Sequence, residues 1–479
     1  MRRLVVIVTL SIFPRLLAAQ PLDVSKLVGE DWYGLYLNGQ KSGFAMNSVA
    51  VDKDGTISVI EDARFKLKMN NVPQDLRTYS KRDYSPEGTL LRFNQQVQDM
   101  TGQSEFTGVV DAQGLKVVSK VGGTTKEERL PIPKETLRDA LKQSLLANPT
   151  AKVGDKIAYT YFEPMVPGEI EGRSEIVGLE TRVLEGAPTK VFKIQTHLEF
   201  MSLDTVSYVT EHGTLLEDIT AGMITMRLEP KEAAQDVNYV NDVLVSNAAY
   251  IDKPIKDPRG RKSLRLVVKG PLTSAHLFND ERQFLTQKGD AFDFTARAIP
   301  MNGFTPVKIP ITEPSVAEWQ KPTRFVQSDD QRLIDKAHEI IGEEKDAKKI
   351  SDLLCAWVNQ NVRTTFSARL TNALEVFNSL EGDCTEHSIL FIGLARAAGL
   401  PAREVAGLIY TDIDKPGFYF HQWAKVWIGK WIDVDPTFDQ PLADVTHIKL
   451  GEGDLFQQAQ LIPIIGRIQV EVVDDANAG

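Results

Sequence analysis

The sequence predicts an α+β protein in which an antiparallel β-rich part comes first and a part that mixes helices with a sheet comes last. Two observations support this class. From Asp31 to about Met226 extended runs alternate with turn signals, and after Thr323 apolar residues recur at helical spacing. The 479 residues suggest several domains of ~100–200 residues each. The content of 42% apolar and 25% charged residues is ordinary for a globular protein.

Residues 1–19 have the pattern of a secretory signal peptide. A positive start at Arg2 and Arg3 precedes an apolar run, and small residues end at Ala19, where we expect cleavage. Arg15 leaves fewer than the ~20 apolar residues that a membrane span needs, which argues against the alternative of an uncleaved anchor. We therefore expect an exported protein, periplasmic or secreted, without an integral membrane segment after the signal.

The net charge of the chain limits the classes of partner that it can bind. A net charge of −10 and a pI near 5.4 argue against nucleic acid as a partner, because nucleic-acid binding requires a basic surface. The sequence does not indicate an oligomeric state.

The region 30–245 is expected to be β-rich. Its extended runs are separated by turn pairs that tolerate positive φ and therefore favour hairpins. These pairs are Asn38-Gly39, Asp54-Gly55, Glu87-Gly88, Gln113-Gly114 and His212-Gly213. One helix is expected near 134–146, where leucines repeat at helical spacing, and it can divide the region into two sub-blocks.

The region 250–322 is expected to be a small β block and linker. A turn-rich stretch, 252–262, precedes two extended runs, Leu264 to Val268 and Phe292 to Ala298. The proline-rich stretch from Pro300 to Pro322 is expected to be extended. At the other end of the chain, 466–479 is expected to form a strand and an acidic tail.

The region 323–465 contains the candidate reactive residues. Asp383 and Glu386 form the pattern of a capping box, which places Cys384 in the first turn of a helix that ends near Gly399. Free N–H groups and the positive end of the helix dipole favour a thiolate there, and they can hold an oxyanion. The alternative is an inert buried cysteine, which is the interpretation we give to Cys355. The two cysteines could also form a disulfide in an exported protein.

A hairpin supplies the partners that a reactive cysteine needs. His421 lies on a strand that ends near Trp427, and Asp435 lies at the end of the returning strand. Because side chains alternate between sheet faces, the two share a face only if a three-residue connection or a bulge lies around Gly429. Asp433 has the same parity and is the rival carboxylate.

A zinc site is the alternative that these residue types also permit. Cys384, His387 and His421 could supply ligands, but a second cysteine pair is lacking and Cys355 is expected in mid-helix. We expect neither a metal nor another cofactor.

Several short segments together resemble the transglutaminase-like superfamily. They are Gly382-Asp383-Cys384-Thr385-Glu386-His387, the helix exit Leu394 to Arg403, His421-Gln422-Trp423, and Trp431 with Asp435-Pro436-Thr437. Gln440, Asp444, Thr446 and His447 continue what looks like a bacterial branch, and Val326 to Asp330 resembles the usual entry. The resemblance covers about Thr323 to Leu450.

The resemblance implies a papain-like fold in which Cys384 is the nucleophile, His421 the base and Asp435 the residue that orients the base. It implies acyl transfer on amide or peptide bonds of a protein or peptide substrate, by hydrolysis or transamidation. The alternatives are a non-catalytic exported binding or scaffold protein with this fold, and an enzyme whose β region masks the site. An oxyanion-hole side chain is not identifiable, although the stretch from Arg363 to Phe366 is the place to look.

Overall fold

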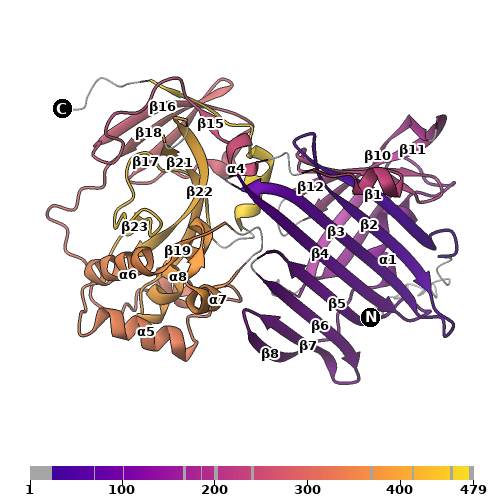
Figure 1. Ribbon diagram of the computed structural model, residues 1–479, viewed down its shortest axis with the longest axis horizontal. Coiled ribbons are helices and arrows are strands. Elements are labelled where there is room, and N and C mark those ends of the chain that lie inside the picture. Colours follow the sequence, from indigo (N-terminus) through magenta and orange to yellow (C-terminus); the bar gives the residue numbers. More distant parts are fainter. Residues whose placement is uncertain are drawn as a thin grey trace, which may run out of the picture.

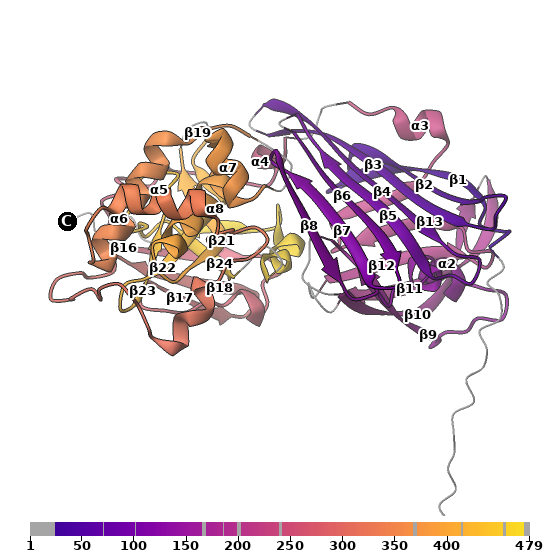
Figure 2. The ribbon, with the colours of Figure 1, turned by 90° about the horizontal axis from the view of Figure 1, so that it is seen from below.

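The computed structural model describes residues 24–69, 71–100, 102–164, 169–184, 186–198, 203–238, 242–366, 371–412, 415–453 and 457–473. The predicted signal peptide and most of the predicted acidic tail lie outside these residues. The described chain is mostly β, with its longer helices in the C-terminal third, in agreement with the predicted α+β class. Figures 1 and 2 show a large β-sheet beside a lobe built by the later part of the chain.

The first lobe is one continuous antiparallel sheet of 14 strands in the order β8-β7-β6-β5-β4-β3-β2-β1-β14-β13-β12-β11-β10-β9. The strands are β1 (Gly29–Leu37), β2 (Gln40–Val51), β3 (Ile57–Met69), β4 (Val72–Tyr84), β5 (Leu90–Gln98), β6 (Gln103–Asp111), β7 (Gly114–Val121), β8 (Thr124–Leu130), β9 (Lys156–Phe162), β10 (Glu169–Leu184), β11 (Ala187–Leu198), β12 (Leu203–Thr210), β13 (Leu215–Thr220) and β14 (Ile224–Leu228). Because β1 pairs with β14, the two sub-blocks considered from the sequence are joined into one sheet.

The helix expected near 134–146 is two short helices, α1 (Leu137–Ala140) and α2 (Lys142–Leu146). They meet at Leu141, whose φ of −103° and ψ of 21° depart from helical values. Leu137 and Leu141 pack against Tyr84 and Leu90 in a buried cluster on the sheet. Two further short helices, α3 (Lys231–Gln235) and α4 (Val243–Ser246), follow the sheet along the chain.

The second lobe contains two more antiparallel sheets. One has the order β17-β18-β16-β25, and the other the order β15-β22-β21-β24 with β23 added beside β22. Their strands are β15 (Ala249–Tyr250), β16 (Ser263–Lys269), β17 (Gln283–Lys288), β18 (Ala291–Arg297), β21 (Ala402–Thr411), β22 (Gly417–Trp427), β23 (Trp431–Val434), β24 (Ile448–Glu452) and β25 (Gln469–Val472). The expected C-terminal strand is therefore a member of the small β block.

The small β block is part of the second lobe and not a separate unit. Leu266 and Phe294 from the small sheet share a buried core with Leu408 and Phe418 from the central sheet. On the other face of the central sheet, a second core gathers the helices, and Ile311 and Val316 belong to it. The stretch 300–322 thus carries apolar side chains into a core, and for this reason it does not act as an extended linker.

The helices of the second lobe cover one face of the central sheet (Figure 1). They are α5 (Gln331–Ile341), α6 (Ala347–Asn361), α7 (Ala373–Ser379) and α8 (Cys384–Ala397). The lobe also contains the 3-10 turns η1 (Ser274–His276), η2 (Pro314–Gln320) and η3 (Gln457–Ile464). A short parallel pair, β19 (Arg363–Thr364) and β20 (Glu381–Gly382), precedes α8. Among the described residues, we find no helix with the length and apolar character needed to span a bilayer.

Candidate active site

Cys384 is the first residue of α8, as predicted. The carboxylate of Asp383 accepts hydrogen bonds from the backbone N–H groups of Thr385 and Glu386, and Glu386 accepts one from the backbone N–H of Asp383. Gly382 is required just before this cap, because a Cβ atom there would lie 2.0 Å from the Cβ of Glu386. The local sequence therefore fixes where the helix begins and sets Cys384 at its head.

The hydroxyl of Ser388 joins the head of α8 to the central sheet. Its Oγ lies 2.7 Å from the carbonyl oxygen of Cys384 and 3.1 Å from that of Gln422 on β22. The thiol of Cys384 in turn receives a hydrogen bond from the backbone N–H of Gln422. Cys384 thus lies beside Gln422, the residue that follows His421 on β22, and it is partly exposed.

The surroundings of the thiol do not lower its pKa, contrary to the expectation from the helix dipole. Burial raises the pKa of the Cys384 thiol well above its usual range, and the carboxyl groups of Asp383 and Glu386 raise it further. The hydrogen bond from the N–H of Gln422 acts in the opposite direction. These effects favour the protonated thiol, so the sulfur would need a neighbouring base to become a nucleophile.

The hairpin of β22 and β23 has the three-residue connection predicted from the parity argument. Trp427 pairs with Trp431, and the connection contains Gly429 with a φ of 105°. With this register Asp435, the residue after β23, comes to the face that carries His421. The Nε2 atom of His421 lies 2.9 Å from the Oδ2 atom of Asp435, and both side chains are buried.

Aromatic rings enclose the imidazole of His421. The ring of Trp423 is stacked at 6.1 Å between centroids, and the exposed ring of Phe438 is tilted at 5.3 Å. Burial on this scale makes the hydrogen bond to Asp435 stronger than it would be in water. The imidazole is thereby held in one orientation.

Asp433, the rival carboxylate, makes a different contact. Its Oδ2 atom lies 2.7 Å from Nε of Arg282, and both side chains are buried. Burial would raise the pKa of Asp433, but Lys449 and Arg282 outweigh it and hold that pKa below its usual range. Asp433 therefore joins the small β block to the central sheet.

The structure agrees with the interpretation of Cys355 as a buried cysteine without a catalytic role. It is a free, buried thiol on α6, and its Sγ lies 3.8 Å from the carbonyl oxygen of Asp435 as a weak donor. Cys384 is also free, so no disulfide joins the two. Burial raises the pKa of the Cys355 thiol far above its usual value, which makes it inert toward electrophiles.

The structure does not assemble the zinc set considered from the sequence. Nδ1 of His387 lies 2.7 Å from the carbonyl oxygen of Asp383 within α8. The group whose ligand atoms do converge, within 4.8 Å of one another in the described part of the chain, is His421, Asp435 and His447. In this group Nε2 of His447 also lies 2.9 Å from Oδ2 of Asp435.

The contact of His447 with Asp435 is the feature that sequence reasoning missed. His447 appeared in the sequence only as part of a resemblance, without a role. The available signal was its place three residues after Asp444, in the turn just before β24 (Ile448–Glu452). Spacing alone could not show that this turn returns to the end of β23.

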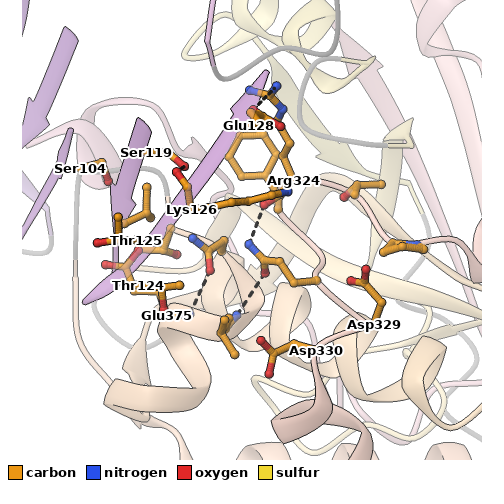
Figure 3. A pocket seen from close by; sticks show the side chains of 18 of the residues that line it. Ser104, Ser119, Thr124, Thr125, Lys126, Glu128, Arg324, Asp329, Asp330 and Glu375 are labelled. Atoms are coloured by element: carbon orange, nitrogen blue, oxygen red, sulfur yellow. Dashed lines mark hydrogen bonds and ion pairs between the residues drawn. The ribbon is translucent and has the colours of Figure 1, made fainter. Parts of the chain in front are cut away.

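A cavity of about 700 Å³ lies between the two lobes, away from these residues (Figure 3). Thr124, Lys126 and Glu128 of β8 line one side, and Arg324 and Glu375 line the other. The guanidinium of Arg324 lies 2.9 Å from the carboxylate of Glu128 and so links the lobes across it. Cys384, His421 and Asp435 are not among the lining residues of this cavity.

The family comparison agrees with the architecture of the second lobe. Residues 334–436 match the model of the transglutaminase-like superfamily, so this stretch is a transglutaminase-like domain. The matched range holds most of α5, all of α6 to α8, the hairpin of β22 and β23, and all three residues predicted as a triad. At the level of the family, the match supports a cysteine-based catalytic role.

Curated relatives share only part of this chain. An uncharacterized protein of Haemophilus influenzae is 30% identical over 126 residues, which cover 25% of this chain and 33% of that protein. An uncharacterized protein of Mycobacterium tuberculosis is 36% identical over 96 residues, which cover 17% of this chain and 30% of that protein. The match thus spans about a third of the length of these relatives.

Two solved structures show a limited similarity to the chain. A candidate cysteine protease from Cytophaga hutchinsonii is 16% identical, with a TM-score of 0.32, over 45% of this chain and 90% of its own. A β-barrel-like protein of unknown function from Brucella abortus is 8% identical, with a TM-score of 0.33, over 42% of this chain and 94% of its own.

Proposed function

We propose that this protein is an exported cysteine hydrolase that acts on an amide or peptide bond of a protein or peptide substrate. Cys384 is the proposed nucleophile, His421 the general base and acid, and Asp435 the positioning residue. The observation that carries the proposal is the buried hydrogen bond of 2.9 Å between His421 and Asp435, on the strand that receives the head of α8. Nucleophilic catalysis by a thiol uses an imidazole that a carboxylate orients in this way, which supports the proposal.

The proposed reaction starts from the protonated thiol. His421 removes the proton as the sulfur of Cys384 forms a bond to the substrate carbonyl carbon, and it then passes the proton to the leaving amine as the C–N bond breaks. Water attacks the thioester, which releases a carboxylic acid and restores the thiol. An amine in place of water would give transamidation, but a partly exposed Cys384 leaves access for water and favours hydrolysis.

The cap of α8 narrows the choice of oxyanion donor. Asp383 already accepts from the N–H groups of Thr385 and Glu386. The backbone N–H of Cys384 itself is therefore the proposed donor to the developing oxyanion.

Alkylation by iodoacetamide tests the proposal without knowledge of the substrate. At neutral pH we expect Cys384 to react faster than a free cysteine peptide, because proton removal by His421 should outweigh the raised pKa of the thiol. The His421→Ala variant should react on the order of tenfold more slowly than the natural protein. Mass spectrometry of the labelled peptides gives both rates, with buried Cys355 as an internal control. A rate equal to that of the free peptide and unchanged by His421→Ala would contradict the proposal.

A substrate experiment addresses the chemistry. A glutamine-containing peptide is expected to leave a thioacyl adduct on Cys384 that acid quenching traps. The adduct should be absent from Cys384→Ala.

The second candidate is a non-catalytic exported binding or scaffold protein. The cavity between the lobes favours it, because none of the proposed catalytic residues lines that cavity. Full biological function in a Cys384→Ala variant would select this candidate.

A further inference from the structure

Asp435 binds two imidazoles through one oxygen atom. Its Oδ2 lies 2.9 Å from Nε2 of His421 and 2.9 Å from Nε2 of His447, while its Oδ1 accepts from the backbone N–H of Thr437 at 2.9 Å. A carboxylate only accepts, so both imidazoles donate their Nε2 protons to it. Because Asp435 and His447 are fully buried, water does not replace either contact.

His447 also faces a second carboxylate. Its Nδ1 atom lies 3.4 Å from Oδ1 of Asp444, whose other oxygen is 2.6 Å from a guanidinium nitrogen of Arg259. With a carboxylate at each ring nitrogen, His447 satisfies both only if both nitrogens carry protons. Burial opposes this charge, but the hydrogen bonds to Asp435 and Asp444 outweigh it and raise the pKa of His447 above its usual value.

Charge balance leads to the same protonation state. Asp435 and Asp444 contribute two negative charges, and Arg259 contributes one positive charge. A positive His447 makes the cluster neutral, whereas a neutral His447 would leave a net negative charge beside a buried carboxylate. The transfer of a proton from Cys384 to His421 leaves the neutral sum unchanged.

Titratable groups from several elements surround the cluster. They include Cys384 and Glu386 of α8 with the N-cap Asp383, Cys355 of α6 with Asp439 near it, and Arg282, which is paired with Asp433 and lies 2.7 Å from the carbonyl oxygen of His447. Arg282 holds the backbone of His447 in place. Among these groups, only His447 brings a cation to the oxygen that orients His421.

We propose that His447 is a permanent imidazolium that positions Asp435 behind His421 and makes the Cys384–His421 pair release its proton more readily. This inference rests on the proposed function for its catalytic meaning. A cation near the pair favours every state that has lost a proton. Removal of that cation should therefore move the pH midpoint of thiol reactivity upward.

The first measurement asks whether the cation exists, and it does not depend on catalysis. In protein labelled with 15N-histidine, one ring should keep two protonated nitrogens at pH 7, and its signals should be absent from His447→Gln. A neutral ring at position 447 at pH 7 would overturn the inference.

The second measurement follows the rate of Cys384 alkylation against pH. His447→Gln keeps a neutral donor toward Asp435 and should move the midpoint to higher pH by about one unit. His447→Phe removes the donor as well and should also lower the plateau rate, on the order of tenfold. The matched control is His276→Gln, which replaces a buried histidine in η1 that bonds to Thr273 and to the carbonyl oxygen of Gln460.

The outcomes separate the two proposals. If the reactivity of Cys384 depends on His421 but the midpoint is the same in His447→Gln as in the natural protein, the inference fails and the proposed function stands. If Cys384 has no enhanced reactivity at all, the proposed function fails, while the 15N spectra still decide the charge of His447. A stoichiometric metal that is present in the natural protein and lost in His447→Gln would also overturn the inference, because the converging ligand atoms would then bind a cation.

Discussion

At the scale of single residues, two aspartates of the same strand parity have different roles. Asp435 is bonded to two imidazoles, whereas Asp433 is bonded to a guanidinium from the small β block. Parity could not separate them, because both side chains point to one face of the hairpin. Their partners come from segments far away in sequence.

Substitution of the two aspartates should therefore separate reactivity from stability. In Asp435→Asn the Nε2 proton of His421 loses its charged acceptor, so alkylation of Cys384 at neutral pH should slow on the order of tenfold or more. The alkylation assay with mass spectrometry measures this, and an unchanged rate would remove Asp435 from the proposed site.

Asp433→Asn is the counterpart and should act on folding. The substitution leaves the guanidinium of Arg282 buried without a charged partner, which should cost about 3–5 kcal/mol of unfolding free energy. Urea denaturation measures the loss. An Asp433→Asn protein with native stability and slow Cys384 alkylation would reverse the roles of the two aspartates.

At the scale of elements, the head of α8 combines a strong cap with an acidic environment. Asp383 fixes the start of the helix, yet its carboxyl group also raises the pKa of the Cys384 thiol. The dipole of the helix favours a thiolate, whereas burial and the adjacent carboxyl groups act in the opposite direction. The cap thus positions the sulfur more than it activates it.

Asp383→Asn should separate positioning from charge. Asparagine caps a helix as well as aspartate does, so the unfolding free energy should change little, while loss of the carboxyl group moves the midpoint of Cys384 alkylation to lower pH. Asp383→Ala should in addition lose about 1 kcal/mol, because the cap itself is removed. A midpoint that is the same in Asp383→Asn as in the natural protein would mean that Asp383 does not govern the thiol.

At the scale of the whole molecule, a buried network of charges joins the small sheet to the central sheet. Asp280 is paired with Lys449 and with Lys425, which lies 3.1 Å away. Burial would raise the pKa of Asp280, but Lys449 and Lys425 outweigh it and lower that pKa to about 2. The network holds the sheet that carries His421 against the β16–β18 block.

This network should make the protein sensitive to acid. A carboxyl group with a lowered pKa in the folded state stabilises the protein above pH 4 and loses that contribution as the pH falls toward 2. For Asp280 the contribution is about 2 kcal/mol. Urea denaturation between pH 7 and pH 2.5 should show the loss in the natural protein and a smaller loss in Asp280→Asn. An equal loss in both would exclude Asp280 as the source.

The shared cores set the limits of an independent folding unit. A fragment of residues 247–473 keeps both cores of the second lobe and should unfold cooperatively. A fragment of residues 323–473 lacks Ile311, Val316 and the strands β16, β17 and β18 of the small sheet, and it should not. Urea denaturation followed by circular dichroism distinguishes the two. Cooperative unfolding of the shorter fragment would show that the small sheet is dispensable.

The longer fragment also tests whether the β-sheet lobe restricts the site. Gln74 of β4 donates to the carbonyl oxygen of Phe366 at 3.1 Å, near the pair β19–β20 that leads into α8. If the sheet masks the site, Cys384 should be alkylated faster in the fragment than in the full chain. Equal rates would argue that the sheet has another role.

Local rules in the sequence determined much of the second lobe. A capping box sets the start of α8 whatever surrounds it, and the alternation of side chains along a strand linked the three-residue turn at Gly429 to the face of Asp435. Both are short-range consequences of backbone geometry, so the positions of Cys384, His421 and Asp435 on their elements could be predicted. The single 14-stranded sheet could not, because turn signals do not say that β1 pairs with β14.

Only the tertiary structure decided which charges meet. The pKa of Cys384, the guanidinium partner of Asp433 and the contact of His447 with Asp435 all depend on segments that are distant in sequence and close in space. Electrostatic energies depend on distance and burial, and neither is contained in residue spacing. The sequence by itself therefore predicted the parts of the candidate site, while the fold determined their protonation and their partners.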